Sequence, residues 1–200
     1  FILPLEEQGM GEIGMDPGIL SLCPDSYIRQ QLQQTVQDLL NPTQEDNPLV
    51  LLLQKIEAAK SYEDKDSLQS VLVMLVEQVY ASDTTDTDIQ GYLAQSQGSL
   101  SWYKLFTQDY KGSTKAARRG LALNPQETWI HTNLAHALLF QGKYEAAKAI
   151  YIRYAPDAPY DEESTWGEVF LADLRELEEA GAIPKERMKD VRKIRRLLNP

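Results

Sequence analysis

Apolar side chains recur every three or four residues through most of the chain, which is the spacing of one face of an α-helix. In the N-terminal half this spacing predicts helices over the ranges 26–40, 48–61 and 67–81. The run Val71–Val76 alone would also suit a buried strand, but its length and flanking pattern favour a helix. Residues 1–24 are rich in glycine and proline and predict a loop or linker.

Residues 86–200 show the same helical spacing, divided by short polar turns. The pattern predicts four helices in succession, over 87–107, 110–123, 127–140 and 144–154. Thr165 and Glu168 then form a capping-box pattern, which marks the start of a helix that ends near Gly181. Pro184 opens a last helix, so residues 165–198 hold two more. No segment requires a strand, and we predict an all-α fold with an N-terminal helical region at 25–85.

The segment after residue 93 repeats itself with a period of 34 residues. This shift aligns four identical pairs and one pair of small residues: Leu100 with Leu134, Leu105 with Leu139, Phe106 with Phe140, Tyr110 with Tyr144, and Ser101 with Ala135. These are positions where the two antiparallel helices of one hairpin must touch. A period of 34 is typical of a helix–turn–helix solenoid, so we predict stacked antiparallel hairpins.

These residues resemble the tetratricopeptide repeat family, in units at about 94–127 and 128–154. The second unit matches the family pattern at Leu134, Ala135, Gly142, Tyr144, Ala147 and Tyr151, and the first at Leu100, Ser101, Tyr110 and Leu121, closing with Asn124-Pro125. The first unit departs from the pattern, because Gln108 replaces the turn glycine and Ser113 replaces the packing alanine. The resemblance implies a short α-solenoid with capping helices over 165–198. Residues 98–200 are similar to C-terminal regions of bacterial proteins of this class.

The resemblance also implies a groove, lined by the first helix of each hairpin, in which a peptide or helix of a partner protein docks. The groove residues that it implies are Ser99 and Trp102 in the first unit, and Trp129, Asn133 and His136 in the second. An asparagine there would hydrogen-bond a partner's backbone amide, and tryptophan supplies a large contact area. The alternative is structural: both tryptophans would pack on neighbouring helices, and Asn133 would cap or bridge locally.

Charge divides the chain into two halves. The formal net charge is −10; residues 1–97 hold 16 acidic and 4 basic side chains, against 14 acidic and 16 basic in residues 98–200. Such acidity argues against nucleic-acid binding, because contacts to phosphates require lysine and arginine. Residues 185–196 carry seven basic side chains, which predict either a solvated capping helix or a surface for an acidic partner. Either the acidic run at 157–179 or the acidic N-terminal half could pair with this helix. Such pairing would lie within one molecule or, in a homodimer, between two.

The sequence offers no set of residues for catalysis, metal binding or a cofactor. His131 and His136 are its two histidines and stand five residues apart, whereas metal ligands on one helical face would be four apart. Cys23 is the single cysteine and lacks a C-x-x-C partner. The glycines at 9, 11 and 14 follow no predicted strand, so they predict no phosphate-binding loop. We therefore expect no enzymatic activity and no cofactor.

Composition bears on the compartment in three ways. A single cysteine fits a reducing compartment and favours a cytoplasmic protein, with a periplasmic or exported protein as the alternative. The longest apolar runs, Leu49–Leu53 and Val71–Val76, are too short to span a bilayer, so we expect no stable membrane insertion. Because the chain begins at Phe1, we expect a piece of a longer polypeptide or the loss of a leader.

Three functions are consistent with these patterns. The first is a noncatalytic scaffold or adaptor that binds a peptide or helix of a partner protein in its groove. The second is a C-terminal regulatory or targeting domain of a larger enzyme. The third is a self-assembling structural protein that dimerises through opposite charges. The 34-residue repeat favours the first.

Overall fold

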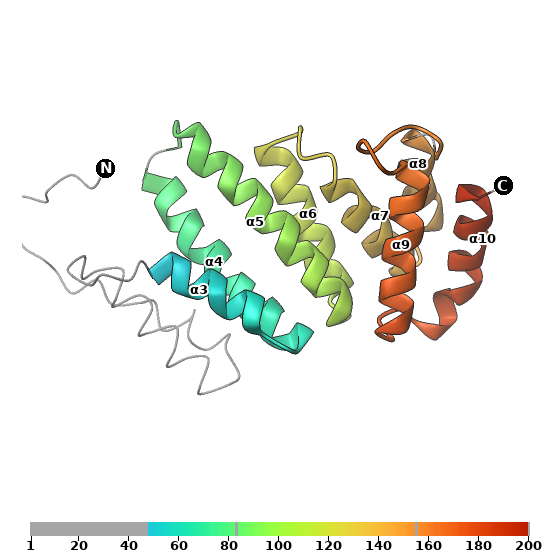
Figure 1. The fold of residues 1–200 in the computed structure, drawn as a ribbon, viewed down its shortest axis with the longest axis horizontal. Helices are drawn as coiled ribbons and strands as arrows, with labels where there is room; N and C mark the ends of the chain where they lie inside the picture. The colour runs from blue at the N-terminus through green and yellow to red at the C-terminus, as the bar shows by residue number, and fades with distance from the viewer. Residues whose placement is uncertain (1–47, 83, 155, 200) are drawn as a thin grey trace, which may run out of the picture. The chain divides into compact units, whose positions relative to one another are not determined.

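The computed structural model describes residues 48–82, 84–154 and 156–199, which form helices joined by turns and loops, without a named strand (Figure 1). In chain order the helices are α3 (Pro48–Ala58), α4 (Tyr62–Ser82), α5 (Thr87–Phe106), α6 (Tyr110–Leu123), α7 (Ile130–Phe140), α8 (Tyr144–Arg153), α9 (Trp166–Glu179) and, after a 3₁₀ turn at Lys185–Arg187, α10 (Met188–Leu198). The predicted all-α class is confirmed for these residues. The predictions for 1–24, 26–40 and Cys23 fall outside them.

The helices from Leu49 onward belong to one compact unit. Within this unit, each helix from α4 to α7 packs on the next one in sequence. α4 packs on α5, α5 forms a hairpin with α6, α6 packs on α7, and α7 forms a hairpin with α8. α5 and α7, the first helices of the two hairpins, also contact each other. The predicted stack of helical hairpins is therefore present.

Most helix boundaries agree with the prediction, but α4, α7 and α10 start elsewhere. α10 begins at Met188, after a 3₁₀ turn that follows Pro184. α4 begins at residue 62 rather than 67, because the Ser61 hydroxyl oxygen accepts the Asp64 backbone amide at 3.1 Å and caps the helix. α7 begins at residue 130 rather than 127. Here the Asn124 side-chain oxygen accepts the backbone amide two residues further on at 3.0 Å, which continues the turn after α6.

α9 begins as predicted, with a capping box. The Thr165 hydroxyl oxygen accepts the Glu168 backbone amide at 3.3 Å, and the Glu168 carboxylate accepts the Thr165 backbone amide at 2.8 Å. The first of these bonds satisfies an amide that the start of the helix leaves without an intrahelical partner, and the second ties the side chain back to the cap. The pair fixes the point at which α9 leaves the preceding loop.

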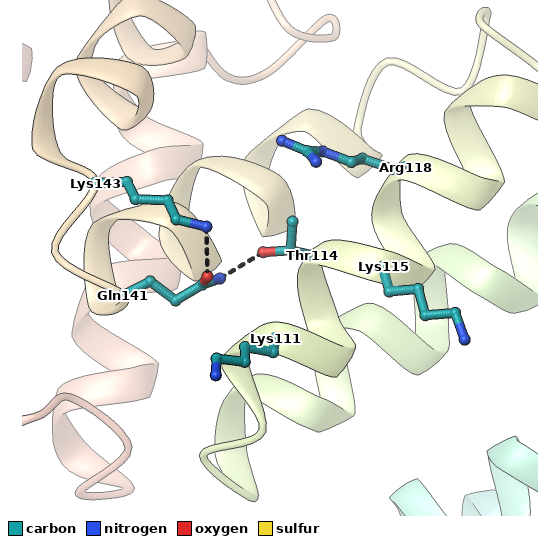
Figure 2. A pocket seen from close by; sticks show the side chains of 6 residues that line it. All are labelled: Lys111, Thr114, Lys115, Arg118, Gln141 and Lys143. Carbon is teal, nitrogen blue, oxygen red and sulfur yellow. Dashed lines mark hydrogen bonds between the residues drawn. The ribbon is translucent and has the colours of Figure 1, made fainter.

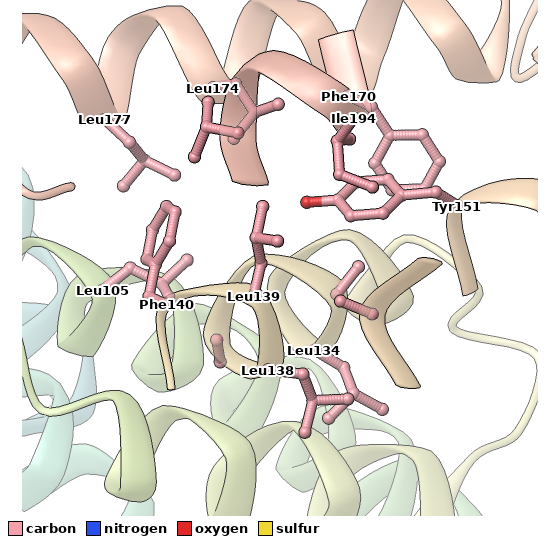
Figure 3. Packing of buried hydrophobic residues seen from close by; sticks show 14 of the residues in the cluster. Leu105, Leu134, Leu138, Leu139, Phe140, Tyr151, Phe170, Leu174, Leu177 and Ile194 are labelled. Carbon is pink, nitrogen blue, oxygen red and sulfur yellow. The ribbon is translucent and has the colours of Figure 1, made fainter. Parts of the chain in front are cut away.

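One hydrophobic core runs from the end of α5 to α10 (Figure 3). Its fully buried members include Tyr151 of α8, Phe170 of α9 and Ile194 of α10. The rings of Tyr151 and Phe170 meet edge to face with centroids 4.7 Å apart, a favourable arrangement for an aromatic pair. A helical hairpin cannot bury its apolar face alone, and here α9 and α10 cover α7 and α8.

Candidate functional site

The first candidate site is the contact between α5 and α7, where the predicted groove residues are found. Trp129 stands one residue before α7, and its indole ring covers Gly98 of α5. A Cβ atom at Gly98 would overlap this ring and stand 2.8 Å from Cγ1 of Ile130. The close approach of the two hairpins at this point therefore requires a residue without a side chain.

Trp129 is held in place while part of it stays exposed. Its ring nitrogen donates to one oxygen of the Glu127 carboxylate at 2.6 Å. The other oxygen accepts the side-chain amide of Gln95 on α5 at 3.0 Å. Hydrogen bonds to an ionised group are stronger than those between neutral groups, so Glu127 fixes the indole relative to α5.

Trp102 and Ser99 of α5 are both half-buried. The Trp102 ring meets Phe106 edge to face at 5.0 Å between centroids, and Phe106 stacks on Tyr62 of α4 at 3.7 Å. Positions 98 and 102 are one helical turn apart and lie on one side of α5. Ser99, Trp102 and Trp129 are each half-buried, and we refer to these three residues together as the α5–α7 face.

Asn133 and His136 lie in the interior instead. Asn133 is 2% exposed, and its side-chain amide donates to the Gly98 carbonyl at 3.0 Å. His136 is 0% exposed. Neither side chain can reach a partner in this arrangement, so the direct contact expected of them is not available. Asn133 bridges α7 to α5, as in the alternative in which it has a structural role.

His136 joins three helices through its two ring nitrogens. Nδ1 lies 2.8 Å from the hydroxyl oxygen of Tyr151 on α8, and Nε2 lies 3.2 Å from a carboxylate oxygen of Asp173 on α9. Burial raises the pKa of Tyr151 well above its ordinary value, so this hydroxyl keeps its proton. Both ring nitrogens are satisfied, and the network fastens the second hairpin to α9.

The second candidate site is an open pocket of about 330 Å³ beside α6, which we name the α6 pocket (Figure 2). It is lined by Lys111, Thr114, Lys115 and Arg118 of α6 and by Gln141 and Lys143 of the turn after α7. Positions 111, 115 and 118 follow one face of a helix. The first hairpin therefore supplies three cations to the pocket, and the second supplies one.

The floor of the α6 pocket is formed by side chains that are hydrogen-bonded to one another and to the backbone. The Gln141 side-chain amide donates to the Thr114 hydroxyl oxygen at 2.6 Å and to the Tyr110 carbonyl at 2.8 Å. The Thr114 hydroxyl donates to the same carbonyl at 3.0 Å, and Lys143 donates to the Gln141 side-chain oxygen at 2.8 Å. These groups satisfy one another, so a ligand would be held mainly by the cations of the rim.

The rim cations are exposed and lack acidic partners within the described part of the chain. Arg119, the next residue of α6, pairs with Glu77 at 3.3 Å. Lys111, Lys115 and Arg118 take part in no ion pair among the residues that the structure describes, and all three are exposed. The pocket is thus a concentrated positive charge on an acidic protein.

The basic helix predicted at 185–196 is partly neutralised by neighbouring carboxylates. Lys193 pairs with Asp190 at 2.8 Å, and Arg195 pairs with Glu178 of α9 at 2.6 Å. The charge pattern of the sequence indicated a basic helix at 185–196 and did not indicate the α6 pocket. The spacing of the α6 cations along one helix face could be read from the sequence. Their proximity to Lys143 could not, because it depends on the packing of the two hairpins.

Metal and membrane sites were also expected to be absent. Within 48–199, apart from the two undescribed positions, no group of three His, Cys, Asp or Glu side chains could hold a metal ion. His131 and His136 have separate partners, since His131 contacts the Tyr154 hydroxyl at 3.0 Å. None of the described helices combines the length and apolar character that crossing a membrane requires.

Comparison with known proteins bears on the repeats. Residues 107–164 match the family model described as tetratricopeptide repeat. The matched segment contains α6, α7 and α8, which include the whole second hairpin. No curated protein and no solved structure matches the chain. Residues 107–164 are therefore similar to the tetratricopeptide repeat family, and the stacked helical hairpins of the structure agree with this match.

Proposed function

We propose that this protein is a noncatalytic scaffold or adaptor that binds a peptide or a helix of a partner protein on the α5–α7 face. Tetratricopeptide repeats are protein-interaction modules, and the family match supports this general role. The observation that carries the finer proposal is the pair of half-buried tryptophans, Trp102 on α5 and Trp129 at the start of α7.

Trp102 and Trp129 have the properties of interface anchors. A few aromatic side chains supply much of the binding energy of a typical protein interface. Neighbouring residues already hold both rings, Phe106 in one case and Glu127 in the other. A partner would therefore bury further apolar area with little loss of side-chain freedom. Ser99 adds a hydroxyl that can donate and accept on the same face of α5.

Asn133 and His136 support this face rather than contact the partner. Asn133 holds α7 against α5 through the Gly98 carbonyl, and His136 holds α7 to α8 and α9. Replacing either residue would shift Trp129 and lower stability together. Replacing Trp102 would reduce binding with a smaller effect on the fold, because part of its ring already faces solvent.

The test compares partner binding by the intact chain and by Trp102→Ala and Trp129→Ala. Partners are first isolated on the immobilised intact chain, and the Kd of each is then measured by calorimetry. Lys189→Ala, an exposed change on α10, is the control. We expect each tryptophan variant to weaken binding by about tenfold or more, and the control to leave it unchanged. Retention of every partner by both tryptophan variants, with unaltered helical content, would contradict the proposal.

A further inference from the structure

The α6 pocket is positively charged, and no carboxylate among the described residues forms an ion pair with its three α6 cations. Lys111, Lys115 and Arg118 repel one another across one helix face, and Lys143 adds a fourth positive charge from the next hairpin. A bound anion would relieve this repulsion. We infer that the α6 pocket is a second docking site, which takes an acidic segment of a partner protein's chain.

The pocket suits several carboxylates better than one phosphate. Its volume of about 330 Å³ is at the lower end of the range for ligand sites, and it is open to solvent. A tight phosphate site would aim backbone amides or arginine forks at one point. Here the floor donors of Gln141 and Thr114 are already used internally. The rim consists mainly of lysines, which act as separate point charges and suit carboxylates spread along a peptide.

A polypeptide is also favoured over a nucleic acid. Proteins that bind single strands place aromatic side chains under the bases, and none of the six lining residues is aromatic. The whole chain carries a formal charge of −10, which repels a long polyanion. A short acidic peptide meets only the local positive charge at separations below the Debye length.

The α6 pocket and the α5–α7 face are formed by different residues. The pocket uses α6 and the turn after α7, whereas the face uses α5 and the residue before α7. This inference therefore stands or fails independently of the proposed function. Changes at the lysines test the pocket, and changes at the tryptophans test the face.

The test measures binding of a fluorescein-labelled hepta-glutamate peptide to the full chain by fluorescence anisotropy, at low and at physiological salt. The pocket variant is Lys111→Glu combined with Lys115→Glu. The matched control is Lys185→Glu combined with Lys189→Glu, because this pair has the same spacing, the same change in charge and equal exposure. Thermal melting of both variants confirms that the fold is retained.

We expect the pocket variant to bind the peptide about tenfold more weakly than the intact chain, and the control to differ by less than about twofold. Binding should also weaken as salt rises. Absence of peptide binding, or equal weakening in both variants, would overturn the inference. So would stronger competition by inorganic phosphate or by an oligonucleotide than by unlabelled peptide. A dimer that the pocket variant abolishes would overturn it too, because a second copy would then be the occupant.

Discussion

The two hairpins of this chain build the same contact between helices from different residues. Positions 101 and 113 of the first hairpin correspond to positions 135 and 147 of the second. In the first, the buried hydroxyl oxygens of Ser101 and Ser113 lie 3.0 Å apart. In the second, Ala135 and Ala147 are both fully buried. The contact therefore requires small side chains, and it accepts polar ones when the two hydroxyls pair.

The turns of the two hairpins show the same relation. Gln108 has φ 62° and Gly142, its counterpart 34 residues on, has φ 79°. Both turns need the left-handed backbone conformation, which glycine adopts without steric cost and glutamine does not. Gln108 therefore makes the first turn less favourable in energy than a glycine would, while both turns keep the same left-handed backbone conformation.

The clearest difference concerns the predicted groove. Trp102 and His136 occupy corresponding positions, but Trp102 is half-buried and His136 is fully buried beside Asp173 of α9. A position in the repeat therefore predicts which side of a helix a residue occupies. Its exposure depends on the element that follows the hairpin.

The largest expected effect comes from enlarging the alanine contact of the second hairpin. Ala147→Leu should lower the free energy of unfolding by about 2–3 kcal/mol, because a buried leucine would force α7 and α8 apart. Urea unfolding measures this change. Ala146→Leu is the control. The Ala146 side chain is exposed, so this change should alter the free energy of unfolding by less than about 0.5 kcal/mol. Equal effects at both positions would contradict the packing described for Ala147.

A side chain at the second turn should be the next most costly change. Gly142→Ala places an L-residue at φ 79° and brings its Cβ to 2.7 Å from Cζ of Arg187. We expect a loss of about 1–2 kcal/mol in the free energy of unfolding. Gly91→Ala, within α5 and with no atom near its Cβ position, should instead stabilise the protein by up to about 1 kcal/mol. Thermal unfolding of the two variants would then shift in opposite directions.

The serine pair offers a test of how polarity is tolerated at the hairpin contact. Ser101→Ala should destabilise the protein by about 1 kcal/mol, because the buried Ser113 hydroxyl loses its partner. The double variant Ser101→Ala with Ser113→Ala should recover part of this loss, since it recreates the alanine pair of the second hairpin. A double variant less stable than the sum of the two single changes would argue against this equivalence.

Relieving the first turn should give a smaller gain. Gln108→Gly should raise the free energy of unfolding by about 0.5–1 kcal/mol, since relief of the left-handed strain exceeds the entropy that glycine adds to the unfolded chain. The variant also loses a long hydrogen bond of 3.4 Å from Gln108 to the Gly181 carbonyl, which is exposed and weak. Chemical denaturation would show the gain, and a loss of stability would mean that the glutamine side chain matters more than its backbone strain.

The smallest effect is a pH dependence confined to the second hairpin, where His131 corresponds to Gln97 of the first unit. Burial lowers the pKa of His131 below its ordinary 6.5, the hydrogen bond to the Thr128 carbonyl opposes this shift, and the charge of Arg153 adds to it. The unfolded chain then binds more protons, so this contribution to stability is complete above about pH 6.5 and declines below it. We would measure the free energy of unfolding of the intact chain and of His131→Gln at two pH values. The variant should lose less stability than the intact chain as the pH falls. An equal loss of stability in the two proteins would contradict the lowered pKa of His131.

Much of the fold could be predicted because its signals are local. The helices α5 and α6, their turn and the Thr165 capping box each depend on residues close together in sequence. The start of α4 was also a local signal, since Ser61 and Asp64 have capping spacing, and it was overlooked. Helical periodicity alone does not locate a helix start, because the cap residue lies outside the repeating pattern.

The candidate sites depend on contacts that no local pattern contains. His136 meets Asp173 across 37 positions, and Asn133 meets Gly98 across 35. Both residues were placed on the correct helix, but their burial follows from the packing of other elements. The α6 pocket likewise needs Lys143 of the second hairpin beside the cations of the first. Tertiary packing decides exposure, and sequence spacing decides only the face of each helix.

The stacking of the two hairpins places the Trp129 ring over Gly98. The most direct measurement is a nuclear Overhauser experiment on the labelled chain, read between the Trp129 ring protons and the α-protons of Gly98. We expect strong cross-peaks and α-proton resonances displaced by the ring current of the indole, both lost in Trp129→Ala. Absence of these cross-peaks in a folded, helical sample would show that the hairpins do not stack in this way.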